Sequence, residues 1–399
     1  MKVSILTETP QRGTFATMLI VYQKLRELGI DSEIFTTFDS EYSVLPSPPR
    51  SRIFGMETVI NGSYSYNVFD LISPKPKDSI LHIANAWHGV IPVANSKNVK
   101  TVINIQYWWV TCYFNSMENP DCGCSGFKNI SSCIARKRTG LRKLGSPGEA
   151  FYAMRKLKKI RENVSKADSI IAVSNIVRNV LVEHNFPEEK IKIININALS
   201  PFITYATYEP SDTFTFAYLS YPDEGKGIFQ LLRAFHKALK LNPNIRLKVP
   251  GGTEEPRVVE EVKTMGLQGK VILTPRLNYE KYVKQVGEFL RDVDVVVVPT
   301  LVPDTWARVV TESMLAGRPV MVTKGNGGLV EQVTDGVDGF HVDVYDLEKF
   351  AKSIYEVSVI PRDQIRKMGV LARENISNKF NSERIMGDLV SLYRSLLEK

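Results

Sequence analysis

The sequence predicts an α/β protein built from two doubly wound domains in tandem. Short β-branched apolar segments alternate with helix-period segments, and this alternation stops and restarts once along the chain. The length of 399 residues suits two domains of ordinary size. Hydrophobic residues make up 43% of the chain and charged residues 24%, a globular composition that excludes a fibrous or disordered protein.

The first half starts with a predicted strand at residues 2–8 and a helix at residues 15–29. The apolar residues of this helix recur at intervals of three and four, and Gly29 ends it. The further strands that we predict are residues 31–38, 79–85, 101–106, 169–174 and 191–196. Each is short, β-branched and apolar, as is typical of strands buried on both faces of a parallel sheet.

The second half repeats this organisation after residues 198–212, which contain two prolines and no periodicity and are the predicted linker. The predicted elements are strands at residues 213–220, 245–251, 271–275, 294–300, 319–323 and 339–342, with a clear helix at residues 227–241. We expect domains at residues 1–200 and 201–375. Two such domains place the carboxyl ends of their strands across a cleft, where ligands bind.

Two acids, Asp304 and Glu312, bracket the start of a predicted helix directly after the strand at residues 294–300. The first turn of that helix offers backbone N–H groups and the positive end of the helix dipole to an anion such as a diphosphate. The carboxylates then suit the hydroxyls of a sugar or a ribose. Two simpler interpretations stay open, because Asp304 suits a helix cap and Glu312 suits a solvated helix surface.

In context these residues resemble the family four retaining glycosyltransferases of the GT-B fold. The stretch "DTWARVVTESMLAGRPVM" matches the family's pair of acids spaced by seven residues. Three more stretches match in the family's order: "ADSIIAVSNIVRNVL", "EGKGIFQLLRAFHKALKLNPNIRLKVPGG" and "GNGGLVEQVTDGVDGF". The final residues, 376–399, resemble the family's C-terminal helix, which packs back toward the N-terminal domain.

The resemblance implies roles for individual residues. Lys226 matches the lysine that pairs with the donor diphosphate, Glu312 the acid that holds the ribose, and Asp304 the acid that contacts the transferred sugar. The other expected donor-site positions are Gly13 in the N-terminal glycine loop, Tyr218, Arg276, and Ala307, Arg308 and Val309 at the helix start. Gly327 and Gly328 precede a helix and form a loop that allows close approach.

Several positions depart from the family pattern. Gln106 stands where many members have a histidine near the acceptor, and it hydrogen-bonds but does not act as a base. Tyr218 occupies the place of an arginine before the lysine, so one cation for the diphosphate is missing; Arg276 or Arg308 would compensate. The first acid is Asp304 rather than glutamate, one methylene shorter.

The resemblance therefore implies a retaining hexosyltransferase that uses a nucleoside diphosphate sugar of the UDP or GDP type. The acceptor would be a glycan or a lipid-linked molecule in cell-surface or glycoconjugate biosynthesis. No metal or other cofactor is required for this chemistry, because Lys226 and the helix start neutralise the leaving diphosphate. A catalytically inactive nucleotide-sugar-binding scaffold of the same fold remains the alternative.

His82 and His88 flank the end of the strand at residues 79–85, where the family often carries histidines facing the cleft. His88 lies beyond the strand end and is the better candidate, with Gln106, for the acceptor site. A satisfied, partly buried histidine is the simpler interpretation of either.

All four cysteines, Cys112, Cys122, Cys124 and Cys133, fall within one segment of 22 residues. Such clustering predicts joint action, and a subgroup of the family has a cysteine-containing insertion here. A structural zinc site with four thiolate ligands is one interpretation, and two disulfides or free thiols are the others.

The net charge of +8 is concentrated in one segment, because residues 136–162 contain ten Lys or Arg and two acids. The later part of this segment is amphipathic, which suits docking to an anionic membrane or a lipid phosphate, although a core-facing helix with a solvated basic face fits as well. No segment is apolar for long enough to span a membrane. We expect a cytoplasmic protein, peripheral at the inner membrane face, with no nucleic-acid partner.

Overall fold

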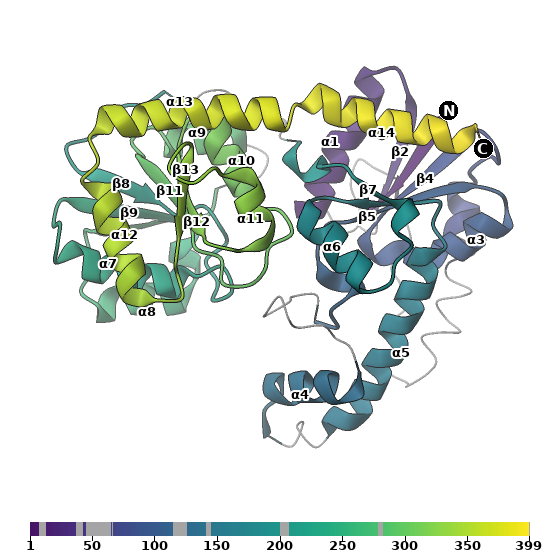
Figure 1. Ribbon diagram of the computed structural model, residues 1–399, viewed down its shortest axis with the longest axis horizontal. Coiled ribbons are helices and arrows are strands. Elements are labelled where there is room, and N and C mark those ends of the chain that lie inside the picture. Colours follow the sequence, from purple (N-terminus) through teal and green to yellow (C-terminus); the bar gives the residue numbers. More distant parts are fainter. Residues whose placement is uncertain are drawn as a thin grey trace. The chain divides into compact units, whose positions relative to one another are not determined.

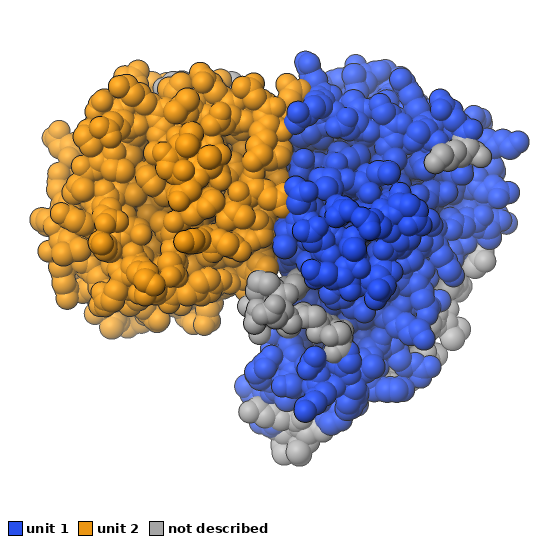
Figure 2. Space-filling view, in the orientation of Figure 1, with its two compact units in different colours: residues 1–199, 382–399 blue, residues 200–381 orange. Residues whose placement is uncertain are grey.

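The computed structural model describes residues 1–7, 13–36, 43–44, 65, 67–114, 126–140, 145–199, 207–277 and 282–398. The chain folds as two compact units (Figure 2). Unit 1 comprises residues 1–199 and 382–399, and unit 2 comprises residues 200–381. The change from unit 1 to unit 2 thus falls inside the predicted linker.

Unit 1 contains a parallel sheet in the order β3-β2-β1-β4-β5-β6-β7 (Figure 1). Its strands are β1 (Lys2–Leu6), β2 (Asp31–Thr36), β3 (Ser43–Val44), β4 (Ser79–Ala84), β5 (Lys100–Ile105), β6 (Ser169–Ala172) and β7 (Ile191–Ile193). Its helices are α1 (Gly13–Glu27), η1 (Asn85–Gly89), α3 (Val90–Ser96), η2 (Trp108–Val110), α4 (Phe127–Lys137), α5 (Ser146–Ser165), α6 (Asn175–Glu183), η4 (Glu188–Lys190), η5 (Ile196–Ala198) and α14 (Ser382–Leu397).

The central strands of unit 1 are enclosed as predicted, and the last one is not. All six residues of β4 are buried. In β7, Lys192 and Ile193 are exposed, so the prediction of burial on both faces is wrong for this strand. The reason is topological: among the described strands β7 lies at the edge of the sheet and pairs with β6 alone.

The C-terminal helix α14 belongs to unit 1, where it packs against α1, β4 and η5. Tyr393 of this helix is fully buried, and its hydroxyl lies 2.5 Å from Nδ1 of His82. Nε2 of His82 is 3.0 Å from Oδ1 of Asn104. Burial lowers the pKa of His82 to about 4, against the opposing effect of Asn104. His82 is therefore a neutral core histidine that anchors α14.

Unit 2 contains a parallel sheet in the order β10-β9-β8-β11-β12-β13. Its strands are β8 (Phe214–Ala217), β9 (Ile245–Pro250), β10 (Val271–Thr274), β11 (Val295–Val298), β12 (Val320–Thr323) and β13 (Gly339–Val342). Its helices are α7 (Ile228–Leu239), η6 (Gly252–Glu254), α8 (Pro256–Thr264), α9 (Tyr282–Phe289), α10 (Arg308–Leu315), α11 (Gly327–Gln332), α12 (Leu347–Ser358) and α13 (Arg362–Lys379).

Helices cover the sheet of unit 2 on both faces (Figure 1). On one face α7 and α12 pack together, and Phe235 and Phe350 are fully buried in the core beneath them. Elsewhere in the unit, α10 packs against α13. The four valines of β11 are buried, which explains why this strand reads as a continuous apolar run.

In each sheet the strand order reverses at one place. In unit 1 the reversal lies between β1 and β4, and in unit 2 between β8 and β11. The loops that follow the two strands leave the sheet in opposite directions there, which opens a crevice at the carboxyl ends. These two switch points decide which loops lie side by side.

Candidate active site

Lys226 and Asp304 meet at the switch point of unit 2. Lys226 follows β8 and Asp304 follows β11, and Nζ of the lysine lies 2.7 Å from Oδ2 of the aspartate. About a third of the lysine side chain is exposed, and 12% of the aspartate side chain. Burial by itself lowers the pKa of Lys226, but Asp304 and Asp223 outweigh it, so the net pKa lies above the usual value and the lysine stays charged.

The loop that carries Lys226 is supported from below by Tyr218. Tyr218 is fully buried, and its hydroxyl donates to the carbonyl of Tyr221 at 2.7 Å. The backbone N–H of Lys226 donates to Oδ1 of Asp223 at 2.9 Å. Tyr218, one of the expected donor-site residues, is thus enclosed beneath this loop, and its hydroxyl also lies 3.4 Å from the carbonyl oxygen of Lys226.

Gly227 makes the exit from this loop into α7. Its φ is +78°, and a Cβ at this position would lie 1.9 Å from the carbonyl oxygen of Pro299. A side chain here would collide with the backbone at the end of β11. The glycine therefore lets the loop after β8 approach the turn after β11.

Asn326 fastens the turn that carries Asp304. Its Nδ2 donates to the carbonyls of Thr300 and Val302, both at 2.9 Å, and its Oδ1 accepts the N–H of Asp304 at 2.9 Å. Asn326 was not among the predicted site residues. The signals for it were its place in a stretch that matches the family and its position next to two glycines before a short helix.

Gly327 and Gly328 lie close to the backbone of Asp304 and Thr305. A Cβ on Gly327 would lie 2.5 Å from the carbonyl oxygen of Asp304, and one on Gly328 would lie 2.2 Å from that of Thr305. The N–H of Gly328 donates to the carbonyl of Asp304 at 2.8 Å. The close approach predicted for this loop is thus an approach to the turn of Asp304.

Both simpler interpretations of the two acids are wrong. Helix α10 begins at Arg308 with Ala307 as its N-cap, and no side chain caps it, whereas Oδ1 of Asp304 accepts the N–H of Trp306 at 3.2 Å. Glu312 is only 3% exposed and pairs with Arg308 at 3.1 Å, so it is not a solvated surface acid. Ala307, Arg308 and Val309 form the start of α10, as predicted.

Arg276 lies at the same edge of unit 2, after β10. Its guanidinium lies over the ring of Tyr221 at 4.7 Å and within 3.6 Å of Glu254. A Cβ on Gly251 would touch Arg276 and Pro222, so the loops after β8, β9 and β10 are in contact. Arg276 is therefore close to the Lys226 loop, with half of its side chain in solvent.

In unit 1 the predicted acceptor residues follow neighbouring strands. His88 lies in η1 after β4, stacks on Trp109 at 5.8 Å between ring centroids, and accepts from Nδ2 of Asn163 at 3.1 Å. Gln106 follows β5 and is buried, with Nε2 3.7 Å from Sδ of Met18. Gly13 is the first residue of α1. The two acceptor candidates thus come from adjacent strands.

The expected zinc site falls partly outside the described residues. Cys112 and Cys133 are buried, one after η2 and one in α4, while Cys122 and Cys124 lie outside the described ranges. Within those ranges no three His, Cys, Asp or Glu side chains gather as metal ligands. The four-thiolate site stays a prediction.

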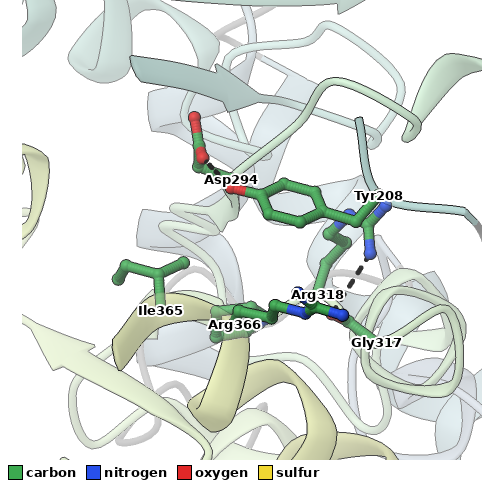
Figure 3. Close-up of a pocket in the computed structure, with 7 residues that line it drawn as sticks. Tyr208, Asp294, Gly317, Arg318, Ile365 and Arg366 are labelled. Atoms are coloured by element: carbon green, nitrogen blue, oxygen red, sulfur yellow. Dashed lines mark hydrogen bonds between the residues drawn. The ribbon is translucent and has the colours of Figure 1, made fainter. Parts of the chain in front are cut away.

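A second acid–base cluster lies at the opposite, amino-terminal edge of unit 2, around a small cavity lined by Tyr208, Asp294 and Arg318 (Figure 3). Asp294 accepts from the hydroxyl of Tyr208 and pairs with Arg362 at 3.2 Å. Arg318 is 2% exposed and donates to the carbonyls of Leu290, Ala316, Gly317 and Thr207. This network was not predicted.

Among the described residues, no helix combines the length and apolarity needed to cross a bilayer.

The predicted apolar face of α5 is confirmed, because Ala150, Ala153, Leu157, Ile160 and Val164 are buried along it. The basic residues of the helix lie on its remaining surface.

The chain is similar in sequence to known glycosyltransferases. A capsular polysaccharide biosynthesis glycosyltransferase, CapM of Staphylococcus aureus, is 24% identical over 275 residues, which cover 65% of this chain and 70% of that protein. A D-inositol 3-phosphate glycosyltransferase of Thermobifida fusca is 28% identical over 48% of this chain, and the match spans 44% of its own length.

The fold is shared with glycosyltransferases of known structure. The crystal structure of Anabaena HepE in complex with UDP and glucose superposes with a TM-score of 0.70 at 14% identity, covering 99% of this chain and all of that one. The α/β architecture of two parallel sheets is thus the GT-B fold. Residues 206–369, nearly all of unit 2, match the family model of the glycosyl transferases group 1. The match covers less than half of the chain, and it places unit 2 among the group 1 glycosyl transferases.

Proposed function

We propose that the protein transfers a hexose from a nucleoside diphosphate sugar of the UDP or GDP type to a glycan or lipid-linked acceptor, with retention at the anomeric carbon. The pairing of Lys226 with Asp304 at the switch point of unit 2 is the observation that carries this proposal. It joins a cation for a diphosphate and a carboxylate for sugar hydroxyls at the place where such sheets bind ligands.

Each residue has a physical role in the proposal. Lys226 and the N–H groups of α10 stabilise the negative charge that develops on the leaving diphosphate. Arg308 or Arg276 supplies the second cation, which the family pattern has and which this chain lacks at Tyr218. Glu312 orients the ribose, and Asp304 orients the transferred sugar once the diphosphate has drawn Lys226 away. Because Lys226, Arg308 and Arg276 are cationic, they neutralise the leaving diphosphate without a metal.

The reaction needs no protein nucleophile in this scheme. The acceptor hydroxyl oxygen bonds to the anomeric carbon as the bond from that carbon to the diphosphate oxygen breaks. The released diphosphate oxygen takes the proton of the attacking hydroxyl on the same face. The enzyme contributes by positioning the reactants and stabilising charge.

The first test is calorimetric titration with UDP, GDP, ADP and dTDP sugars. We expect one donor to bind the wild type and to lose its affinity in Glu312→Ala, while Glu356→Ala, an exposed acid of the same unit, keeps it. Turnover is then measured with the donor that binds. Binding without transfer to any acceptor favours the scaffold alternative, and the absence of any nucleotide-sugar binding contradicts both.

The basic segment at residues 136–162 supports a further part of the proposal, contact with an anionic membrane surface. Phe127 in α4 and Phe151 in α5 are exposed, and Arg155 lies over the ring of Phe151 at 5.4 Å. Exposed aromatic rings beside basic side chains suit a lipid headgroup layer. We expect sedimentation with phosphatidylglycerol vesicles at low salt and not with phosphatidylcholine, and Phe151→Ser to weaken it; equal recovery with both lipids contradicts this part.

A further inference from the structure

One face of α5 carries a row of polar side chains that is separate from its buried apolar face. The row is Tyr152, Lys156, Lys159 and Asn163, spaced by four, three and four residues, so the four side chains lie above one another along the helix. We call it the α5 row. Lys156 and Lys159 are exposed, whereas Asn163 is only 4% exposed. The row thus runs from solvent into the body of unit 1.

The α5 row lies against the segment that follows β5. At its other end the row reaches His88. Nζ of Lys156 is 5.8 Å from the ring centroid of Tyr113, and Tyr152 contacts the same ring edge-to-face at 6.4 Å. At the other end, Asn163 donates to His88, which stacks on Trp109. The row therefore leads to the carboxyl ends of β4 and β5, the side of unit 1 where an acceptor is expected.

Two buried polar atoms at this end have no hydrogen-bond partner among the described residues. They are the indole N–H of Trp109, which is 5% exposed, and Oδ1 of Asn163. Leaving such atoms unpaired costs free energy. One is a donor and the other an acceptor, and a hydroxyl group satisfies both kinds of atom.

The charge along the row is positive. Burial lowers the pKa of His88 to about 4, and the positive charges of Lys156 and Lys159 act in the same direction. Residues 136–162 contain two acids, and one of them, Glu149, is bound by Arg138 through two hydrogen bonds. Two lysine ammonium groups one turn apart act as point charges, which suits a phosphate group better than a carboxylate that prefers the planar fork of arginine.

We propose that the α5 row binds an acceptor that carries a phosphate group. Lys156 and Lys159 hold the phosphate, while Asn163, His88 and Trp109 hold a neighbouring hydroxyl. This inference rests on the proposed glycosyl transfer and deepens it by naming the chemistry of the acceptor. Lys158, on the same helix but outside the row, takes no part.

The test uses the ring signals of the five histidines, observed by NMR in the full chain labelled at histidine. The probe is glycerol 3-phosphate, with glycerol as the neutral reference, at a constant pH of about 7.5, above the unperturbed histidine pKa. We expect the signals of His88 to shift with the phosphate and those of His236, a residue of unit 2, to stay. In the double variant Lys156→Gln, Lys159→Gln the dissociation constant rises at least about tenfold, because two charge-assisted contacts are lost.

The matched control is Lys158→Gln, which removes one charge from the same helix and keeps the affinity. Vesicles of phosphatidic acid in phosphatidylcholine test the lipid source of the same group. A His88 response to the soluble ester assigns a soluble acceptor, and a response only to the vesicles assigns a lipid headgroup. The proposal is overturned if neither probe moves His88, or if Lys158→Gln weakens binding as much as the double variant.

Donor binding separates this proposal from the proposed function. The double variant retains the affinity of the wild type for the nucleotide sugar that the calorimetric titration identifies, because Lys226 and Glu312 are untouched. A wild type that binds the phosphate probe but no nucleotide contradicts the transferase proposal alone. A double variant that loses both affinities shows a structural role for the two lysines and contradicts the acceptor site.

Discussion

The two ends of the sheet in unit 2 each carry an acid paired with a base, and the surroundings of the two pairs differ. At the carboxyl end, Lys226 and Asp304 come from two loops, and a third of the lysine side chain reaches solvent. At the amino end, the side chain of Asp294 is fully enclosed and accepts from the N–H of Thr215 at 2.7 Å as well as from Arg362.

The partners decide what each pair does. Arg318 donates to backbone carbonyls, and the enclosed carboxylate of Asp294 accepts from Tyr208, Arg362 and the N–H of Thr215, where solvent does not reach it. Lys226 and Asp304 are bonded to each other in a place that solvent reaches, and a diphosphate and a sugar hydroxyl can take their places. A charged pair therefore indicates a binding site when a ligand can reach it and replace the two partners.

Asp294→Ala should give the largest loss of stability. It removes a buried carboxylate and leaves Tyr208, Arg362 and the N–H of Thr215 without it, at a cost of about 3 kcal/mol in the free energy of unfolding. Urea unfolding measures this. Asp292→Ala, two residues away and about a third exposed, should cost less than about 1 kcal/mol. Equal losses for the two variants contradict the structural assignment of the amino end.

Lys226→Gln should have the opposite effect: little loss of stability and a large loss of activity. The amide still donates to Asp304, so the free energy of unfolding changes little, while the charge that stabilises the leaving diphosphate is lost. We expect kcat/KM to fall by roughly 10²- to 10³-fold, as when one transition-state donor is removed. Lys270→Gln, an exposed lysine of the same unit, should keep full activity. A stable Lys226→Gln enzyme with normal turnover excludes the proposed role.

The sheets of both units were predictable because central parallel strands are buried on both faces and appear as short apolar runs. The edge position of β7 was not, since it depends on strand order. The same limit hid the pair at the switch point. Lys226 and Asp304 are 78 positions apart, and only the adjacency of β8 and β11 brings them together.

The supporting residues were missed for a different reason. Asn326 and Arg318 lie in stretches that match the family, but the resemblance gives these two positions no role, and polar residues are usually at the surface. In the structure each is buried because it satisfies backbone carbonyls that no regular element satisfies. Such residues become visible only when the backbone path is known.

Gly227→Ala tests whether the close approach at the carboxyl end matters. A Cβ there meets the carbonyl of Pro299 at 1.9 Å, while Gly269, with the same φ of +78°, has open space around it. Gly269→Ala should cost about 1 to 2 kcal/mol for the left-handed conformation alone. Gly227→Ala should cost more in unfolding free energy and also weaken donor binding, because the Lys226 loop must move. Equal effects of the two variants in both measurements argue against this contact.

Tyr218→Phe should give the smallest effect. The ring remains buried, and the hydroxyl no longer donates to the carbonyl of Tyr221 or to that of Lys226 at 3.4 Å, which costs about 1 kcal/mol. Burial raises the pKa of this tyrosine, so the hydroxyl is protonated and donates at any pH where the protein functions. If Tyr218 positions Lys226, the variant lowers donor affinity and kcat together while the salt dependence of donor binding stays unchanged, because no charge has been removed. If Tyr218 contacted the donor directly, as the sequence suggested, discrimination between donor sugars would change instead, and that result would move the residue from beneath the site into it.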